Sequence, residues 1–327
     1  MAVLATDFIV LNQRDNVATA RRPLKGGTSV AVGDRRIQLR QTIPGGHKVA
    51  LASIDAGKEL LKYGQIIGFA KEDIEPGDWV HTHNVVLKSV GRDYGFCEEM
   101  TELPPLERDR DTFHGYARPG GAAGTRYYIA VLSSVNCSAS VARYVADHFR
   151  SSDFKSDFAN VDGVVAFTHK GGCSYDPNHG HELLQRVIAG MARHPNIGGY
   201  VLVGLGCEVN QIPGLVEKHH LDQLQDGEQA PTFLTIQQTG GVRKTVESVV
   251  KAVEKMLPEI SAAKRTTQPV GKLALAMNCG GSDANSGISA NPALGVASDE
   301  LVRQGAASVF GETTEIYGAG HLRTRRA

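Results

Sequence analysis

The stretch YYIAVLSSVNCSASVARYVADHF at residues 127–149 decides the fold. Its first nine residues are mostly apolar and partly β-branched, which is typical of a strand covered on both faces. From residue 140 onward, apolar side chains recur at helical spacing. A strand followed at once by a helix is the repeating element of an α/β fold with a parallel sheet.

The same alternation of strand and helix continues along the chain. The predicted strands are 127–135, 161–168, 198–205, 231–236, 272–277 and 307–312. The predicted helices are 140–149, 181–193, 242–256 and 291–304, with a weaker one after residue 206. We therefore expect parallel strands joined by right-handed crossovers, with a break near residues 261–268 between two α/β parts.

Residues 7–90 have a different pattern, with short β-rich runs separated by turns such as PGG at 44–46 and PGD at 76–78. This pattern predicts a compact β module. The stretch that follows lacks periodicity and is expected to be a surface linker. The predicted domains are the β module at 1–90, the linker at 91–124, an α/β domain at 125–265 and the start of an incomplete second one at 266–327.

Charge and composition exclude several classes of partner. Lysine plus arginine and aspartate plus glutamate both number 35, so the net charge is zero and neither nucleic acid nor an anionic membrane is an expected partner. The first residues show no signal-peptide pattern, and no apolar run approaches the ~18 residues of a membrane span. Five widely spaced cysteines argue against a disulfide framework, so we expect a cytoplasmic protein with free, catalytic or metal-bound thiols.

Chemistry in an open α/β sheet is expected in the crevice outside the carboxyl ends of the strands. Four of the five cysteines directly follow predicted strands: Cys137, Cys173, Cys207 and Cys279. We therefore predict that these four thiols lie at one edge of one sheet. Small thiols can simply fill tight turns, but a shared edge favours a crevice whose thiolates bind a soft metal. The absence of a CxxC spacing excludes a zinc ribbon.

Glycine pairs beside these cysteines predict close approach of a ligand to the backbone. The pairs are Gly171 with Gly172, Gly240 with Gly241, and Gly280 with Gly281, the last followed by Ser282. Exposed N–H groups at helix starts suit a carboxylate or phosphate, although tight-turn geometry alone also explains such pairs. Neither GxGxxG after the first strand nor GxxxxGK[ST] is present, so dinucleotide and P-loop binding are not expected.

The β module contributes imidazoles in two motifs, GGHK at 45–48 and HTHN at 81–84. If HTHN lies on a strand, His81 and His83 face the same side and can meet one partner. Taken alone, the pair is expected to be exposed to solvent and not to act as a ligand. His179 and His181 lie in a polar stretch, where we expect no ligand role.

The chain resembles the altronate and galactarate dehydratases along nearly its whole length. The matching stretches include IPGGHKVAL at 43–51, HTHN at 81–84, SVNCSASVA at 134–142, RHPNIGGYVLVGLGCEVNQ at 193–211 and CGGSDANSGISANPALG at 279–295. The resemblance implies an N-terminal β-clip module of the SAF type followed by dehydratase domains. It also implies a metal-dependent lyase that converts a hexonate or hexarate to a 2-keto-3-deoxy acid. Members of the family continue with further glycine-rich motifs that this sequence lacks.

Removal of water from a 2,3-dihydroxy acid requires loss of the C2 proton, stabilisation of an enediolate and protonation of the departing C3 hydroxyl. The acid–base candidates are His47, His83 and His169, with Lys48 or Lys170 to pair with the carboxylate and Asp283 to bind metal or orient a histidine. The metal-ligand candidates are Cys137, Cys173, Cys207, Glu208 and Cys279. The expected cofactor is a divalent metal such as Fe²⁺, with an iron–sulfur cluster as a second possibility.

The expected partners are a small sugar acid and either further copies of the chain or a polypeptide that supplies the missing C-terminal part. We expect residues 1–327 alone to have little dehydratase activity, because a crevice at strand ends is built from loops on several strands. The contrasting hypothesis is a non-catalytic chain that binds a sugar acid or serves as a subunit.

Overall fold

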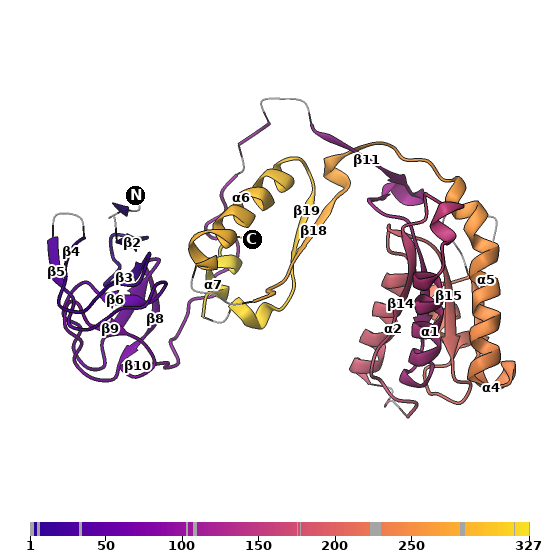
Figure 1. The fold of residues 1–327 in the computed structure, drawn as a ribbon, viewed down its shortest axis with the longest axis horizontal. Helices are drawn as coiled ribbons and strands as arrows, with labels where there is room; N and C mark the ends of the chain where they lie inside the picture. Colours follow the sequence, from indigo (N-terminus) through magenta and orange to yellow (C-terminus); the bar gives the residue numbers. More distant parts are fainter. Residues whose placement is uncertain are drawn as a thin grey trace. The chain divides into compact units, whose positions relative to one another are not determined.

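The computed structural model describes residues 3–4, 7–32, 35–102, 104–106, 110–174, 176, 178–222, 230–281, 285–316 and 318–326 (Figure 1). The chain divides into two units. Unit 1 comprises Met1–Pro104, Ala276–Glu300 and Ser308–Ala327, and unit 2 comprises Pro105–Leu275 and Leu301–Ala307. Among the residues covered, none of the helices combines the length and the apolar character needed to cross a bilayer.

Unit 2 is built, within its described part, on a four-stranded parallel sheet in the order β14-β13-β15-β16. These strands are β13 Tyr128–Ser133, β14 Gly163–Phe167, β15 Ile197–Gly204 and β16 Thr232–Thr235. All four were predicted, which confirms the α/β fold class. The chain adds strands first on one side of β13 and then on the other, so the order of strands reverses between β13 and β15.

Helices cover both faces of this sheet (Figure 1). On one face, Val141 and Val145 of α1 pack with Val249 and Val253 of α5 against β13 and β15. On the other face, Ile188 of α2 and Leu215 of α3 pack against the same strands. The helices of unit 2 are α1 Ala139–Ser151, α2 His179–Ala192, α3 Ile212–His219, α4 Ile236–Thr239 and α5 Val242–Ala262.

The predicted linker at 91–124 and the predicted break at 261–268 contain strands that the sequence pattern did not indicate. β11 Thr112–Ala117 pairs with β12 Ala123–Gly124 and, antiparallel, with β17 Thr266–Pro269. The expectation of an irregular surface linker was therefore wrong for residues 112–117. Their partner lies far away in sequence, so local alternation could not reveal the pairing.

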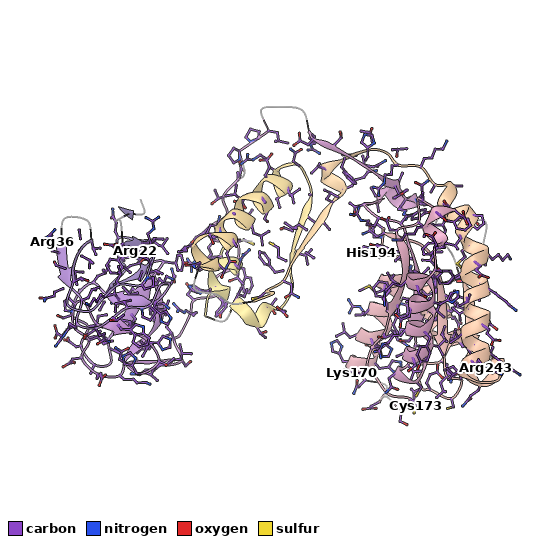
Figure 2. The ribbon with its side chains drawn as sticks, viewed as in Figure 1. Arg22, Arg36, Lys170, Cys173, His194 and Arg243 are labelled. Carbon is purple, nitrogen blue, oxygen red and sulfur yellow. The ribbon has the colours of Figure 1, made fainter. Side chains whose placement is uncertain are left out.

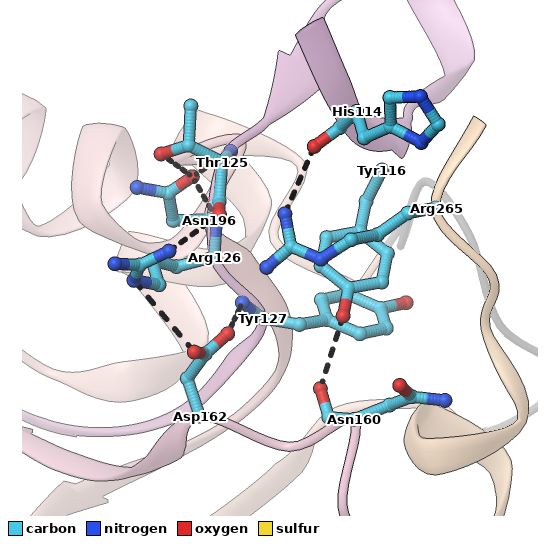
Figure 3. A network of polar contacts seen from close by, with 9 residues as sticks. All are labelled: His114, Tyr116, Thr125, Arg126, Tyr127, Asn160, Asp162, Asn196 and Arg265. Atoms are coloured by element: carbon cyan, nitrogen blue, oxygen red, sulfur yellow. Dashed lines mark hydrogen bonds and ion pairs between the residues drawn. The ribbon is translucent and has the colours of Figure 1, made fainter. Parts of the chain in front are cut away.

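A polar and aromatic network closes the amino ends of the parallel strands (Figure 3). The rings of Tyr116 and Tyr127 stack with centroids 4.7 Å apart, and the guanidinium of Arg265 lies 4.6 Å from the Tyr116 centroid. Asp162, just before β14, accepts a 2.6 Å hydrogen bond from the backbone N–H of Tyr127. Asn196, just before β15, accepts a 2.8 Å hydrogen bond from the Thr125 N–H. This end of the sheet is fixed by contacts within the protein.

The N-terminal β module of unit 1 consists of short antiparallel strands, as predicted. One sheet has the order β1-β2-β3-β6-β9, another has the order β10-β8-β7, and β4 and β5 form a hairpin. Two apolar clusters fill the module, one around Phe8 and Leu39 and the other around Leu60 and Ile74. The strands are β1 Val3–Leu4, β2 Phe8–Val10, β3 Val17–Ala20, β4 Ser29–Val32, β5 Arg35–Gln38, β6 Lys48–Ala50, β7 Glu59–Lys62, β8 Gln65–Ala70, β9 Trp79–Val80 and β10 Val85–Val86.

The last part of the chain has little core of its own. β18 Ala274–Met277 and β19 Ala307–Phe310 form a separate two-stranded sheet. None of the residues of α6 Ala290–Arg303 is buried, and Val296 is 71% exposed. The following short helix is α7 Gly320–Thr324, after which Arg325 forms ion pairs with Asp93, Glu98 and Glu99 at 2.7–2.8 Å. Short 3-10 helices lie at Pro119–Gly121, Asn136–Ser138, Phe154–Ser156, Val270–Lys272, Ser286–Ile288 and Thr313–Ile316.

Candidate active site

Three strand-to-helix turns meet where the strand order of the unit 2 sheet reverses. They follow β13, β14 and β15 and carry Cys137, Cys173 and Cys207 respectively. The Asn136 N–H donates to the Gly171 carbonyl at 2.8 Å, and the Val209 N–H donates to the Cys173 carbonyl at 2.9 Å. Figure 2 shows Lys170 and Cys173 at this end of unit 2, opposite the end that carries His194. Ligands of open α/β sheets bind at such a reversal.

The three thiols lie near enough to influence one another. Cys137 and Cys207 are exposed, Cys173 is half-buried, and all three are free thiols. Burial and the neighbouring Cys173 raise the pKa of the Cys137 thiol, and Cys207 and Glu208 raise it further. A cation among these groups would have the opposite effect, because it stabilises thiolates. Within the described ranges, however, no three His, Cys, Asp or Glu side chains are arranged to hold a metal ion.

Cys279 belongs to a different sheet. It follows β18, which belongs to the separate two-stranded sheet, and it falls in unit 1. The prediction that four thiols share the edge of one sheet was therefore wrong for Cys279 and holds for the other three. The strand before Cys279 resembles the others in sequence, and sheet membership depends on packing that a single strand does not reveal.

Glu208 is 2% exposed and is held by its own turn. Its Oε1 accepts hydrogen bonds from the Ser134 hydroxyl at 2.7 Å and from the Leu205 N–H at 3.1 Å. Its Oε2 accepts from the Gly206 N–H at 2.6 Å. Both carboxylate oxygens thus have partners within the protein.

A second buried contact joins the same strand end to helix α2. The Asn210 side chain donates to the Ser134 carbonyl at 3.0 Å and accepts from Gln185 at 3.0 Å. His181 is 7% exposed, and its Nε2 lies 3.2 Å from Asn210 Oδ1. Sequence reasoning did not select Ser134, Asn210 or Gln185. It began the predicted helix at His181, which the structure places in the first turn of α2, but it expected no ligand role for this residue.

His169 holds the turn after β14. Its Nε2 lies 3.2 Å from the Ser133 carbonyl, to which it donates, and its Nδ1 accepts from the Gly171 N–H at 3.0 Å. The contacts assign the neutral Nε2–H tautomer and leave neither ring nitrogen available to a substrate in this arrangement. Burial lowers the pKa of His169 from 6.5, against smaller raising effects of hydrogen bonds to the Ser133 and Ser134 backbone. Lys170, the next residue, is exposed.

The lowered pKa of His169 predicts a loss of stability in acid. Because the unfolded chain binds the proton more readily, the contribution of His169 is complete above pH 6.5 and is lost as the pH falls through the folded pKa. We expect urea titrations of wild type and His169→Gln to converge in free energy of unfolding as the pH falls from 7.5 to about 5. The exposed His148 gives the control, His148→Gln, which makes the same exchange of residue types away from this turn. A constant difference for His169→Gln would contradict the expectation.

The predicted substrate glycines fall into three groups. Gly171 and Gly172 lie in the turn that His169 holds, at the thiol edge. Gly240 and Gly241 have φ values of 92° and 106° and join α4 to α5, a conformation that favours glycine. Gly280 and Gly281 follow β18 in unit 1. Ser282 and Asp283 lie outside the described residues.

The histidines of the β module gather around one indole. The Trp79 Nε1–H donates to His47 Nδ1 at 3.1 Å, and the rings of His81 and His83 lie 5.2 Å and 5.3 Å from Trp79. The His47 and His81 rings stack at 5.2 Å. Burial, His81 and the adjacent Lys48 of β6 lower the pKa of His47. This imidazole cluster is His47, His81 and His83 around Trp79.

The HTHN motif itself is not a strand. β9 ends at Val80, and residues 81–84 form a turn in which Asn84 Oδ1 accepts from the His81 N–H at 3.0 Å. The motif therefore lacks the strand geometry considered for it, and both His81 and His83 are exposed, as expected for the pair taken alone, while their rings contact one indole. That partner, Trp79, was missed, although it is the chain's one tryptophan and lies two residues before the motif, which was an available signal.

Three domain models of one family match the chain. Residues 6–88 match the altronate/galactarate dehydratase SAF domain, and residues 115–261 match the second domain of D-galactarate dehydratase/altronate hydrolase. Residues 270–327 match the C-terminal domain of D-galactarate/altronate dehydratase. The first match confirms the expected SAF module.

The chain is also similar to curated relatives. It is 33% identical to the altronate dehydratase of Bacillus subtilis over 98% of this chain and 62% of the relative. It is 37% identical to the galactarate dehydratase (L-threo-forming) of Escherichia coli, again over 98% and 62%. The chain thus spans 62% of the length of these relatives.

A further relative is divided between two subunits. The (2R)-sulfolactate sulfo-lyase subunit beta of Chromohalobacter salexigens is 29% identical over 66% of this chain and 50% of its own length. Subunit alpha from the same organism is 37% identical over 26% of this chain and 98% of its own length. With all three domain models in chain order and both dehydratases aligned across almost every residue, the chain belongs to the altronate/galactarate dehydratase family.

Proposed function

We propose that this chain acts as a hydro-lyase on a sugar acid such as altronate or galactarate, forming a 2-keto-3-deoxy acid with a divalent cation at the thiol edge of unit 2. The observation that carries the proposal is the meeting of Cys137, Cys173 and Cys207 at the strand-order reversal of a dehydratase-family domain. Relatives named altronate and galactarate dehydratases support the substrate class.

The thiols at this edge are a residue type that suits a cation such as Fe²⁺, although no three described His, Cys, Asp or Glu side chains are placed to hold one in this structure. Burial and the nearby Cys173 and Cys207 raise the pKa of the Cys137 thiol, so a cation beside Cys137 would be favoured, and thiolates suit soft and borderline metals. Cys137, Cys173 and Cys207 would hold the ion. When bound, it would supply a Lewis acid that stabilises the negative charge that develops beside the substrate carboxylate.

Protein groups would carry the proton transfers. His47 and His83 remain the acid–base residues proposed from the resemblance to the family, whereas His169 uses both ring nitrogens to hold its own turn. The lowered pKa of His47 keeps its imidazole neutral at physiological pH, and Nδ1, which accepts from the Trp79 Nε1–H in this structure, is the atom that would take a proton once that hydrogen bond is released. Lys170 or Lys48 would pair with the substrate carboxylate. Asp283, directly after the CGGS stretch, would bind the metal or orient a histidine through its carboxylate.

A keto-acid assay over a panel of hexonates and hexarates tests the reaction. With Fe²⁺ present and the chain completed as described in the Discussion, we expect a 2-keto-3-deoxy product, and His47→Ala and Asp283→Ala should each lower the rate by about 100-fold or more. His114→Ala is the matched control, because His114 is exposed and contacts Arg265 only through its carbonyl. Unchanged rates in both variants would remove these residues from the mechanism, and no keto acid from any substrate would refute the proposal.

A second candidate is a sugar-acid-binding subunit that needs a partner chain for turnover. It is favoured by the relative whose corresponding segments lie on separate alpha and beta subunits. The two candidates differ in one measurement. A subunit of this kind binds the sugar acid in equilibrium dialysis and forms keto acid only when a second polypeptide is added.

A further inference from the structure

We propose that Glu208 is a positioning residue, whose buried carboxylate fixes Cys207 relative to Cys137, and not a metal ligand. The proposal rests on the proposed function only in treating these thiols as the working edge of unit 2. It concerns the contacts of one side chain and is tested without measuring turnover.

The carboxylate joins the two turns that carry the thiols. Glu208 directly follows Cys207, and its partner Ser134 lies three residues before Cys137. The 2.7 Å hydrogen bond from the Ser134 hydroxyl thus links the end of β13 to the turn after β15. The Asn210 side chain makes a second link by donating to the Ser134 carbonyl.

The same carboxylate shapes the turn in which Cys207 lies. The N–H groups of Leu205 and Gly206 both point at Glu208, at 3.1 Å and 2.6 Å. With the Ser134 hydroxyl, three donors converge on a side chain that is 2% exposed. A buried carboxylate whose oxygens already accept three N–H and O–H hydrogen bonds has little capacity left for a cation.

The backbone is shaped to admit this carboxylate. A Cβ atom added at Gly204 would lie 2.4 Å from Glu208 Oε1 and 3.0 Å from the Ser134 hydroxyl. Glycine at the end of β15 therefore leaves the space that the carboxylate occupies. Neither glycine nor alanine at position 204 can bind a metal through its side chain. The substitution Gly204→Ala therefore displaces the Glu208 carboxylate without removing a possible ligand, which separates a positioning role from a ligand role.

Amide hydrogen exchange measures the positioning directly. We expect Glu208→Gln to speed exchange of the Leu205 and Gly206 N–H groups by about tenfold or more, because each loses a charged acceptor. Gly204→Ala and Ser134→Ala should also speed it, since one displaces the carboxylate and the other removes its link to β13. Glu217→Gln, an exposed carboxylate on α3, is the matched control and should leave the exchange unchanged.

Cadmium titration of the apoprotein, followed by thiolate-to-metal absorption, separates the two roles. A positioning role predicts weaker cadmium binding in Glu208→Gln, Ser134→Ala and Gly204→Ala alike. A ligand role predicts weaker binding in Glu208→Gln alone, with amide exchange at Leu205 and Gly206 unchanged, and that result would overturn the proposal. Absence of lyase activity would refute the proposed function while leaving both measurements valid.

Discussion

Cys207→Ser and Cys137→Ser should each weaken Fe²⁺ binding and lower keto-acid formation by at least about 100-fold, the effect expected when a ligand is removed from a metal site. Serine keeps the size of the side chain but replaces a soft thiolate donor by a hydroxyl that stays protonated. Iron content after anaerobic loading gives the first measurement, and the keto-acid assay gives the second.

Two other cysteines complete the design. Cys97→Ser is the control, because Cys97 lies in unit 1, within the segment between the β module and β11, and should leave both quantities unchanged. The Cys279→Ser variant tests whether a thiol from the other sheet contributes to iron binding, as the sequence predicted. Full iron content in both Cys207→Ser and Cys137→Ser would exclude these thiols as the metal site.

The relatives contain a segment that residues 1–327 do not span. Adding this segment should raise turnover by about 100-fold, because a misplaced catalytic group commonly lowers the rate by about that factor. The reason lies in the segment after β17. Helix α6 has no buried residue, and Val296 and Val309 are 71% and 51% exposed. Apolar faces of this kind call for a covering polypeptide.

The comparison needs two proteins at equal iron: residues 1–327, and the same residues fused to the remaining C-terminal part of the Bacillus subtilis relative. Amide exchange in α6 should slow in the fusion, which shows that the face is covered even if turnover is limited by another step. A fusion carrying an unrelated domain of similar size is the control. Equal turnover of the short and fused chains would show that the additional segment is not needed.

The parallel sheet could be predicted because each of its strands is a short apolar run that is recognisable from local sequence alone, as in YYIAVLSSV at 127–135. It also placed Cys137, Cys173 and Cys207 correctly, since the carboxyl ends of parallel strands meet at one edge. Both inferences need only local pattern and a topological rule. The pairing of β11 with β17 is a contact between distant segments with no local signature, and it was missed.

Roles within the site were harder to predict than positions. Glu208 and His169 are residue types that bind metals or move protons, and both were selected for that chemistry. Their hydrogen bonds to Ser134, Gly206 and Gly171 became visible only with the backbone in place. A sequence shows which groups reach a strand end, whereas the folded chain shows which of their atoms are already engaged.

The pairing of β11 with β17 determines where the polypeptide enters and leaves the parallel-sheet fold. Thr112 lies opposite Pro269 across the antiparallel ladder, so the chain enters and leaves the parallel-sheet fold on neighbouring strands. Such a segment has the topology of an insertion, with start and finish side by side, which is the arrangement tolerated in circular permutation and domain transplantation. The segment that carries Cys137, Cys173 and Cys207 thus begins and ends on paired strands, although Leu301–Ala307 belong to the same unit.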